Sequence, residues 1–277
     1  MANIKEQYGP WALVTGASSG IGTEFARQLA AEGLNVVLVA RREETLRKLG
    51  SELERDHSVE TRVVAQDLGI DGAAAAVLDA VDDLDVGLVV SNAGAGKMGG
   101  FLQNSSADLR GMLMLNVITQ MELSHGFATR LASRGRRGGL LLLSSTSALQ
   151  PVPLIANYAA AKSYILNLGE ALNHELKPLG IDVSVLVPGP TKTPGLLERD
   201  DVDFSVMPLP PMEVGDVVRD GLNALVAKKR SRIAGFINRL MAALTPRSLA
   251  ILMWGSLLRK GLPSRLLPAT TVQTPAE

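Results

Sequence analysis

Short apolar runs alternate with longer helical stretches along the first 190 of the 277 residues. The runs are four or five residues long, which suits strands buried on both faces of a sheet. They cover residues 11–14, 36–40, 62–65, 86–90, 140–143 and 183–187. Stretches with helical length and propensity cover 23–32, 43–56, 73–81, 106–133 and 158–179. This alternation predicts βαβ units, and therefore an α/β, Rossmann-like, doubly wound parallel sheet with helices on both faces.

The regular pattern ends near residue 188. Six prolines between 188 and 212 remove backbone donors, so we expect a long irregular loop there. Helical patterns resume at 213–227, at 237–244 and, after Pro246, up to residue 260. We expect one domain over 1–262, with a substrate loop at 188–212, a C-terminal helical cover at 213–262 and a flexible tail at 263–277.

Charge is divided unevenly along the chain. Residues 1–220 hold 19 basic and 27 acidic side chains, a net charge of −8. Residues 221–276 hold nine basic and no acidic side chains, a net charge of +9. The overall charge of zero argues against a wholly basic protein that binds nucleic acid. The chain has no cysteine and only isolated histidines, so we predict no metal site.

The N-terminus lacks the basic start and apolar stretch of a secretory signal. The longest apolar run, 248–258, is shorter than the roughly 18 residues that a spanning helix needs. We therefore expect a soluble cytoplasmic protein, with peripheral membrane contact through the C-terminal region left open.

A glycine-rich turn, TGASSGIG, joins the first apolar run to the first helical stretch. Gly16 permits a tight turn, Gly20 lets the backbone approach a pyrophosphate, and Gly22 lets the helix pack on the strand. The helix then begins with unpaired amides that attract phosphate. The turn predicts a dinucleotide site, to which Ser18, Ser19 and Ile21 also belong.

Further motifs follow the turn in order: Asp67-Leu68, Asn92-Ala93-Gly94, Asn116, Ser145, Tyr158 with Lys162, and Pro188-Gly189 with Thr191 and Thr193. Over residues 10–195 the series resembles the classical short-chain dehydrogenase/reductase family. The resemblance implies an enzyme that transfers hydride between a nicotinamide and a carbonyl or alcohol, commonly as a dimer or tetramer. It also implies that Asp67 bonds the adenine amino group and that the motifs at 68, 92–94 and 188–193 border the cofactor.

Tyr158 and Lys162 are four residues apart and share one face of a helix. A nearby ammonium favours phenolate, so we expect a lowered pKa for Tyr158. The resemblance implies that Tyr158 gives a proton to the substrate carbonyl, with Ser145 bonding the same oxygen. Ser144 is the alternative to Ser145, which the spacing favours. Lys162 would hold the nicotinamide ribose, and Asn116 would hold a water that links Lys162 to solvent.

The end of the second apolar run reads Val39-Ala40-Arg41-Arg42. Ala40 stands where NAD-preferring relatives carry an aspartate, and a guanidinium suits the geometry of a phosphate. We therefore predict NADP(H), held by Arg41. Arg42 is a second candidate or simply solvated. The glycine turn lacks the basic residue that some NADP-dependent relatives have, and Ser18 could bond the phosphate instead.

Apolar residues surround the expected substrate position: Leu149, Val152, Leu154, Ile155, Leu196, Leu197 and Met207. They predict a small hydrophobic substrate, namely a ketone, an aldehyde, a steroid-like compound or an acyl compound. One alternative is a non-catalytic NADP(H)-binding regulator or scaffold, which we would expect to have lost Tyr158 or Lys162. Another is a reductase of carrier-bound acyl groups, which would need a basic patch beside the pocket.

Segment 228–260 combines basic with large apolar residues. One interpretation is a helical pair lying at a membrane interface, where basic residues meet anionic head groups. The other is a core, pocket or subunit-contact element whose charges face water. The sequence leaves both interpretations open.

Overall fold

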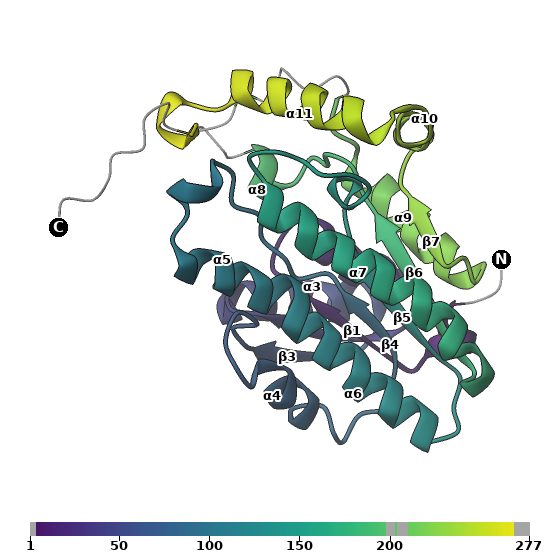
Figure 1. Ribbon diagram of the computed structural model, residues 1–277. Helices are drawn as coiled ribbons and strands as arrows, with labels where there is room; N and C mark the ends of the chain where they lie inside the picture. The colour runs from purple at the N-terminus through teal and green to yellow at the C-terminus, as the bar shows by residue number, and fades with distance from the viewer. Residues whose placement is uncertain (1–3, 198–202, 204–209, 269–277) are drawn as a thin grey trace.

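The computed structural model describes residues 4–197, 203 and 210–268. Seven parallel strands form one sheet in the order β3-β2-β1-β4-β5-β6-β7 (Figure 1). Their bounds are β1 Trp11–Thr15, β2 Asn35–Ala40, β3 Thr61–Ala65, β4 Val86–Ser91, β5 Gly138–Leu143, β6 Ile181–Val187 and β7 Ser231–Ile233. The strand order reverses direction at β1, so the doubly wound parallel sheet that the sequence predicts is confirmed.

Helices cover both faces of this sheet. The α-helices of the described residues are α1 Ile4–Tyr8, α2 Gly20–Ala31, α3 Glu43–His57, α4 Ala73–Asp79, α5 Ser106–Leu113, α6 Thr119–Ser133, α7 Ala156–Glu175, α8 Pro194–Leu197, α9 Val214–Val226, α10 Phe236–Leu244 and α11 Arg247–Gly261. Successive residues of a strand point to opposite faces. Ala12 and Val14 therefore join the core beneath α2, α3 and α9, whereas Trp11 and Leu13 join the core beneath α4, α6 and α7.

The structure departs from the predicted elements at four places, one of which is the short helix α8 inside the expected irregular loop. The stretch 106–133 is not one helix, because a π-helical turn, Met114–Ile118, separates α5 from α6. Strand β7 is three residues long and lies among basic residues, so it carries no strand pattern of its own. It forms because Val185–Val187 offer an open sheet edge for Ser231–Ile233 to pair with. The five-residue helix α1 was also not predicted.

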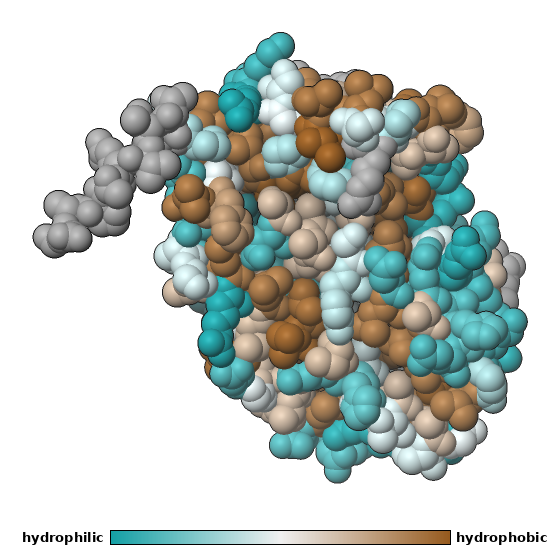
Figure 2. Space-filling model, in the orientation of Figure 1, coloured by the Kyte–Doolittle hydropathy of each residue, from teal (hydrophilic) through white to brown (hydrophobic). Residues whose placement is uncertain are grey.

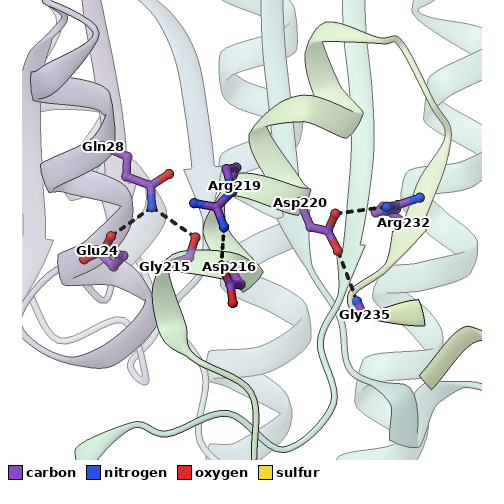
Figure 3. Close-up of polar contacts among 8 residues, drawn as sticks. All are labelled: Glu24, Gln28, Gly215, Asp216, Arg219, Asp220, Arg232 and Gly235. Carbon is purple, nitrogen blue, oxygen red and sulfur yellow. Dashed lines mark hydrogen bonds and ion pairs between the residues drawn. The ribbon is translucent and has the colours of Figure 1, made fainter. Parts of the chain in front are cut away.

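The C-terminal helices α10 and α11 lie together at one end of the molecule (Figure 1). Asp220 of α9 anchors their start, accepting hydrogen bonds from Arg232 Nη2 and from the Gly235 amide, each at 3.0 Å (Figure 3). Gly235 has φ +77°, a left-handed conformation that favours glycine. Gln28 of α2 similarly reaches the carbonyl of Gly215 at 3.1 Å, which ties α2 to α9.

Within the described part of the chain, no helix has both the length and the apolar character needed to cross a bilayer.

Candidate functional site

A cleft of about 870 Å³ opens at the carboxyl ends of the strands, the edge at which parallel sheets bind ligands. We call it the larger cleft. It brings together most of the predicted cofactor residues: Gly16, Ser18, Ser19, Gly20, Ile21, Arg41, Arg42, Asp67, Leu68, Asn92, Ala93, Gly94, Tyr158, Lys162, Pro188 and Thr193. Gly22 and Asn116 do not line it, and Gly189 and Thr191 lie in the wall of a neighbouring pocket.

The glycine turn has backbone angles that glycine adopts more readily than other residues. Gly16 and Gly20 adopt φ +68° and +57°, values that side chains disfavour. A Cβ on Gly22 would come within 2.2 Å of the Gly16 carbonyl oxygen, so only glycine lets α2 begin so close to the turn. Ser19 makes no side-chain capping bond to α2. The first amides of α2 are therefore available to an anion.

Two arginines follow β2 at the rim of the larger cleft. Arg41 is exposed and lines the cleft. Arg42 Nη2 donates to the Ser18 carbonyl at 3.0 Å and to Ser18 Oγ at 3.2 Å. Arg42 is therefore fixed against the glycine turn, a contact that the sequence did not reveal, and both guanidinium groups flank one end of the cleft.

Lys162 is buried in the floor of the larger cleft, with 3% of its surface exposed. Its Nζ donates to the Leu143 carbonyl at 3.0 Å and lies 5.8 Å from the centroid of the Tyr158 ring. Ser144 Oγ donates to the backbone carbonyl of Lys162 at 2.7 Å, which fixes this turn of α7 against the end of β5. Burial lowers the pKa of Lys162 to about 8.

The expected lowering of the Tyr158 pKa is wrong for this structure. Burial raises the pKa, and the hydrogen bond with Ser145 opposes that effect without overcoming it. The reason is that the free energy lost when a phenolate is removed from water exceeds the stabilisation that its hydrogen-bond partner provides. Tyr158 is thus a neutral phenol near neutral pH, the form that can give a proton to a carbonyl oxygen.

Asn116 lies in the π-helical turn and is fully buried. Its Nδ2 donates to the carbonyls of Ala95 (2.8 Å) and Met112 (2.9 Å), whereas its Oδ1 has no partner. A Cβ on Gly94 would come within 2.7 Å of Asn116 Oδ1 and 3.0 Å of Lys162 Nζ. The absence of a side chain on Gly94 lets these two groups converge, and an orphaned acceptor beside an ammonium suits a bridging water.

The two serines after β5 have different surroundings. Ser144 is committed to Lys162, as described above, whereas Ser145 Oγ accepts hydrogen bonds from Ser147 N (3.2 Å) and Ser147 Oγ (2.8 Å). Both serines line a second pocket together with Tyr158, but Ser145 is the one that forms a hydrogen bond with Tyr158. This arrangement favours Ser145 over Ser144 as a contact for substrate.

The second pocket is smaller, about 530 Å³, and we call it the apolar pocket. Of the expected substrate contacts, Leu149, Val152, Ile155 and Leu196 line it. Leu154 is buried outside its wall, Leu197 is exposed, and Met207 lies outside the described residues. The wall also includes residues of α10, α11 and the turn between them, within the segment 213–262 where the sequence predicted a helical cover: Asn238, Met241, Ala242, Thr245, Met253, Trp254 and Leu258. The sequence did not indicate which of their side chains would line the pocket.

Tyr158 lies in the walls of both spaces, as do Gly94 and Pro188. Gly96 packs against it, since a Cβ there would come within 3.2 Å of the ring. The larger cleft and the apolar pocket therefore meet at the Tyr158 side chain. A ligand in each would bring its reacting atoms to the same phenol.

Comparisons with known proteins agree with this geometry. Residues 10–201 match the family model for short chain dehydrogenases. The chain is 34% identical over 237 residues to the 7beta-hydroxysteroid dehydrogenase of Clostridium sardiniense, covering 86% of this chain and 90% of that protein. A structure solved to study 7beta-hydroxysteroid dehydrogenase stereoselectivity has a TM-score of 0.84 at 32% identity, covering 91% of this chain and 99% of that one. A short-chain dehydrogenase from Sphingobium yanoikuyae in complex with NADPH has a TM-score of 0.76 at 31% identity, covering 81% and 87%. The matched residues 10–201 include the whole described lining of the larger cleft.

Proposed function

The chain belongs to the short-chain dehydrogenase family and is an oxidoreductase, and we propose that it transfers hydride between NADP(H) and a bulky, apolar carbonyl or alcohol compound. Hydroxysteroids and their ketones are the leading substrate class. The observation that carries the proposal is the position of Tyr158, in the shared wall of a cleft lined by cofactor motifs and a pocket lined by apolar side chains.

NADP(H) is favoured over NAD(H) by the residues that follow β2. Ala40 lines the larger cleft without the carboxylate that would repel a 2′-phosphate. Arg41 and Arg42 offer guanidinium groups at the same end, and Arg42 Nη2 donates to the hydroxyl of Ser18 in the glycine turn at 3.2 Å. The relative from Sphingobium yanoikuyae, whose structure contains NADPH, supports the same choice.

The proposed chemistry uses four side chains of this protein. NADPH, when bound, supplies the hydride. Tyr158 donates its proton to the carbonyl oxygen, and Ser145 donates a hydrogen bond to that oxygen. Lys162 would hold the ribose hydroxyls of the nicotinamide nucleotide and would stabilise the phenolate of Tyr158. Asn116 Oδ1 holds a water through which the proton is replaced, consistent with its lack of any other partner.

The apolar pocket sets the substrate class. Its volume falls in the range of roughly 300–1,000 Å³ that is typical of sites for small molecules. Leu149, Val152, Met241 and Trp254 contribute apolar wall, and Ser145 and Tyr158 contribute the polar groups of the proposed chemistry. A rigid apolar molecule with one reacting carbonyl fits this distribution, and the likeness to a 7beta-hydroxysteroid dehydrogenase supports a steroid.

Tyr158→Phe tests the proposed proton donor. We expect NADPH oxidation with steroid ketones to fall by about 10²–10⁴-fold, the usual contribution of a general acid. The Kd for NADPH should stay nearly unchanged. Tyr164→Phe is the matched control, because Tyr164 lies exposed on the same helix. Retained turnover in Tyr158→Phe would refute the role of Tyr158.

A wild-type chain that binds NADPH but reduces no steroid, fatty-acyl or aromatic carbonyl would favour the non-catalytic regulator.

Ala40→Asp tests the cofactor. A carboxylate at this position repels the 2′-phosphate and can accept bonds from the ribose hydroxyls of NAD. We expect the ratio of kcat/KM for NADPH to that for NADH to fall by at least tenfold. Arg47→Ala should leave the ratio unchanged, since Arg47 pairs with Glu43 on the exposed side of α3. An unchanged ratio in Ala40→Asp would contradict the NADP(H) assignment.

A further inference from the structure

Helices α10 and α11 are apolar on two opposite sides. Their inner sides line the apolar pocket, α10 and the residue after it through Met241, Ala242 and Thr245, and α11 through Met253, Trp254 and Leu258. A surface helix of a water-soluble protein ordinarily turns polar residues outward. These two helices do not, and their outer sides carry a second set of large apolar residues.

The outer apolar side chains are strongly exposed. On α10 the exposed fractions are Phe236 69%, Ile237 55%, Leu240 47% and Leu244 70%, and on α11 they are Leu249 54% and Leu252 72%. At roughly 100° per residue, positions 236, 240 and 244 form one stripe along α10, turned away from Ala242 and Thr245. Figure 2 shows hydrophobic side chains gathered at the end of the molecule that carries both helices. We call this surface the outer face of α10 and α11.

A loop that contacts the segment after α11 also exposes apolar side chains. The Gly100 amide donates to the Leu266 carbonyl at 2.8 Å, which joins the loop after β4 to the segment after α11. Phe101 and Leu102 follow directly in that loop and are 60% and 83% exposed. Monomeric soluble proteins rarely expose apolar patches of this extent unless the patch binds something.

Basic residues flank the outer face, and one acidic residue, Asp203, lies beside the end of α11, where its amide donates to the Gly261 carbonyl at 2.9 Å. Arg239, Arg259, Lys260 and Arg265 lie on or beside the two helices, and the sequence has no acidic residue between 221 and 276. By helical geometry, Arg259 and Lys260 share the outer side of α11 with Leu249 and Leu252. Within the described residues, no acidic side chain forms an ion pair with any of these four cations.

We propose that the outer face of α10 and α11 docks on the surface of an anionic lipid bilayer. Apolar side chains would enter the boundary between head groups and acyl chains, and the flanking cations would meet the lipid phosphates. The helices would lie in the plane of the interface, which agrees with the lack of a described helix able to span it.

Charge favours a bilayer over a second copy of this chain as the occupant. Pairing two outer faces would bring together two surfaces that each carry Arg239, Arg259 and Lys260, and like charges across an interface oppose association. An anionic bilayer offers the opposite charge together with an apolar layer. The proposal rests on this surface alone and does not depend on the identity of the substrate.

Flotation of the full-length protein with lipid vesicles tests the proposal. We expect binding to vesicles that contain phosphatidylglycerol, much weaker binding to phosphatidylcholine alone, and release as salt is raised. Leu244→Ser with Leu252→Ser should abolish flotation. Arg259→Ser with Lys260→Ser should weaken it by about 30-fold. Neither pair of residues lines the larger cleft or the apolar pocket, so NADPH binding should persist and report correct folding.

Lys177→Ser with Leu179→Ser is the matched control. It removes one cation and one exposed leucine just after the C-terminal end of α7, outside the outer face of α10 and α11. It should float like the wild type. Failure of the wild type to bind anionic vesicles at low salt would overturn the proposal. So would flotation of the two outer-face variants at wild-type strength. Sedimentation without lipid supplies a further check, since conversion of a dimer into monomers by Leu244→Ser with Leu252→Ser would make the outer face a subunit contact instead.

Discussion

Lys162 is an ammonium group held where charge is disfavoured. It is almost completely buried, and its nearest polar partner is the Leu143 carbonyl rather than a carboxylate. Hydroxyl groups of a bound ligand would stabilise the ammonium of Lys162. The phenolate that forms on Tyr158 in the proposed reaction would stabilise it further. The lowered pKa is therefore a property of the site before its ligands bind.

This burial predicts a particular dependence of stability on pH. The pKa of Lys162 is about 8 in the folded chain and about 10.5 in the unfolded chain. Between these values the unfolded chain binds more protons, so the contribution of Lys162 to the free energy of unfolding rises with pH. Relative to Lys162→Met, the wild type should gain about 2 kcal/mol from about pH 7 to about pH 9.5 in urea unfolding. A difference that stays constant with pH would contradict the burial of a charged Lys162.

Individual residues differ in how far the sequence could place them. Gly16, Tyr158 and Lys162 follow from spacing, because turn geometry and helical periodicity depend on neighbours in the chain. The direction of the Tyr158 pKa could not be predicted in this way, since it depends on burial among groups distant in sequence. The contact of Arg42 with Ser18 was missed for the same reason, as it joins two turns that only the fold brings together.

Among the elements, the α10–α11 pair depends on one carboxylate. Asp220 of α9 receives both Arg232 and the Gly235 amide, and α10 begins directly after Gly235 (Figure 3). Asp220 is therefore a positioning residue for the wall of the apolar pocket, which it does not itself line.

Asp220→Asn should loosen this wall without disturbing the larger cleft. We expect KM for a bulky ketone to rise several-fold while the Kd for NADPH stays the same, since α10 contributes no described residue to the larger cleft. Asp216→Asn is the control, because Asp216 lies on the same helix and pairs with the exposed Arg219. Equal effects of the two substitutions on KM, or a matching loss of NADPH affinity in Asp220→Asn, would contradict the positioning role.

The elements that the sequence predicted well are those with a strong local pattern. Six strands and their crossover helices were expected within a few residues of their bounds. Strand β7 and the π-helical turn were not, because the first depends on an edge offered by β6 and the second on the packing of Asn116 beneath the loop at 94–95. Both lie beside the site, where tertiary contacts outweigh local preference.

On the scale of the whole molecule, a hydrogen bond joins the first helix, α1, to strand β6. Tyr8 is fully buried, and its hydroxyl donates to Asp182 Oδ2 at 3.1 Å. Lys228 Nζ lies 3.2 Å from the other oxygen of Asp182. Burial and the neighbouring carboxylate raise the pKa of Tyr8. This cluster joins three distant parts of the chain near the amino ends of the strands, opposite the proposed active site.

Tyr8→Phe should lower the free energy of unfolding by about 1–3 kcal/mol, because the nearly buried carboxylate of Asp182 loses a donor. Turnover should be unchanged at temperatures where the protein stays folded. Chemical denaturation and steady-state assays on the same samples would measure both effects. Tyr164→Phe removes an exposed hydroxyl and should leave stability unaltered. If the free energy of unfolding of Tyr8→Phe equals that of the wild type, the hydrogen bond from Tyr8 to Asp182 does not stabilise the fold.

The division of the two binding spaces along the chain bears on how such a protein can diversify. The described lining of the larger cleft ends at Gly195, whereas the apolar pocket takes much of its wall from residues after 237. Recombination with a related gene near codon 235 would therefore exchange the α10–α11 part of the apolar pocket while preserving the whole described lining of the larger cleft. Selection can act on that part of the pocket separately, with Gly235 as the natural crossover point.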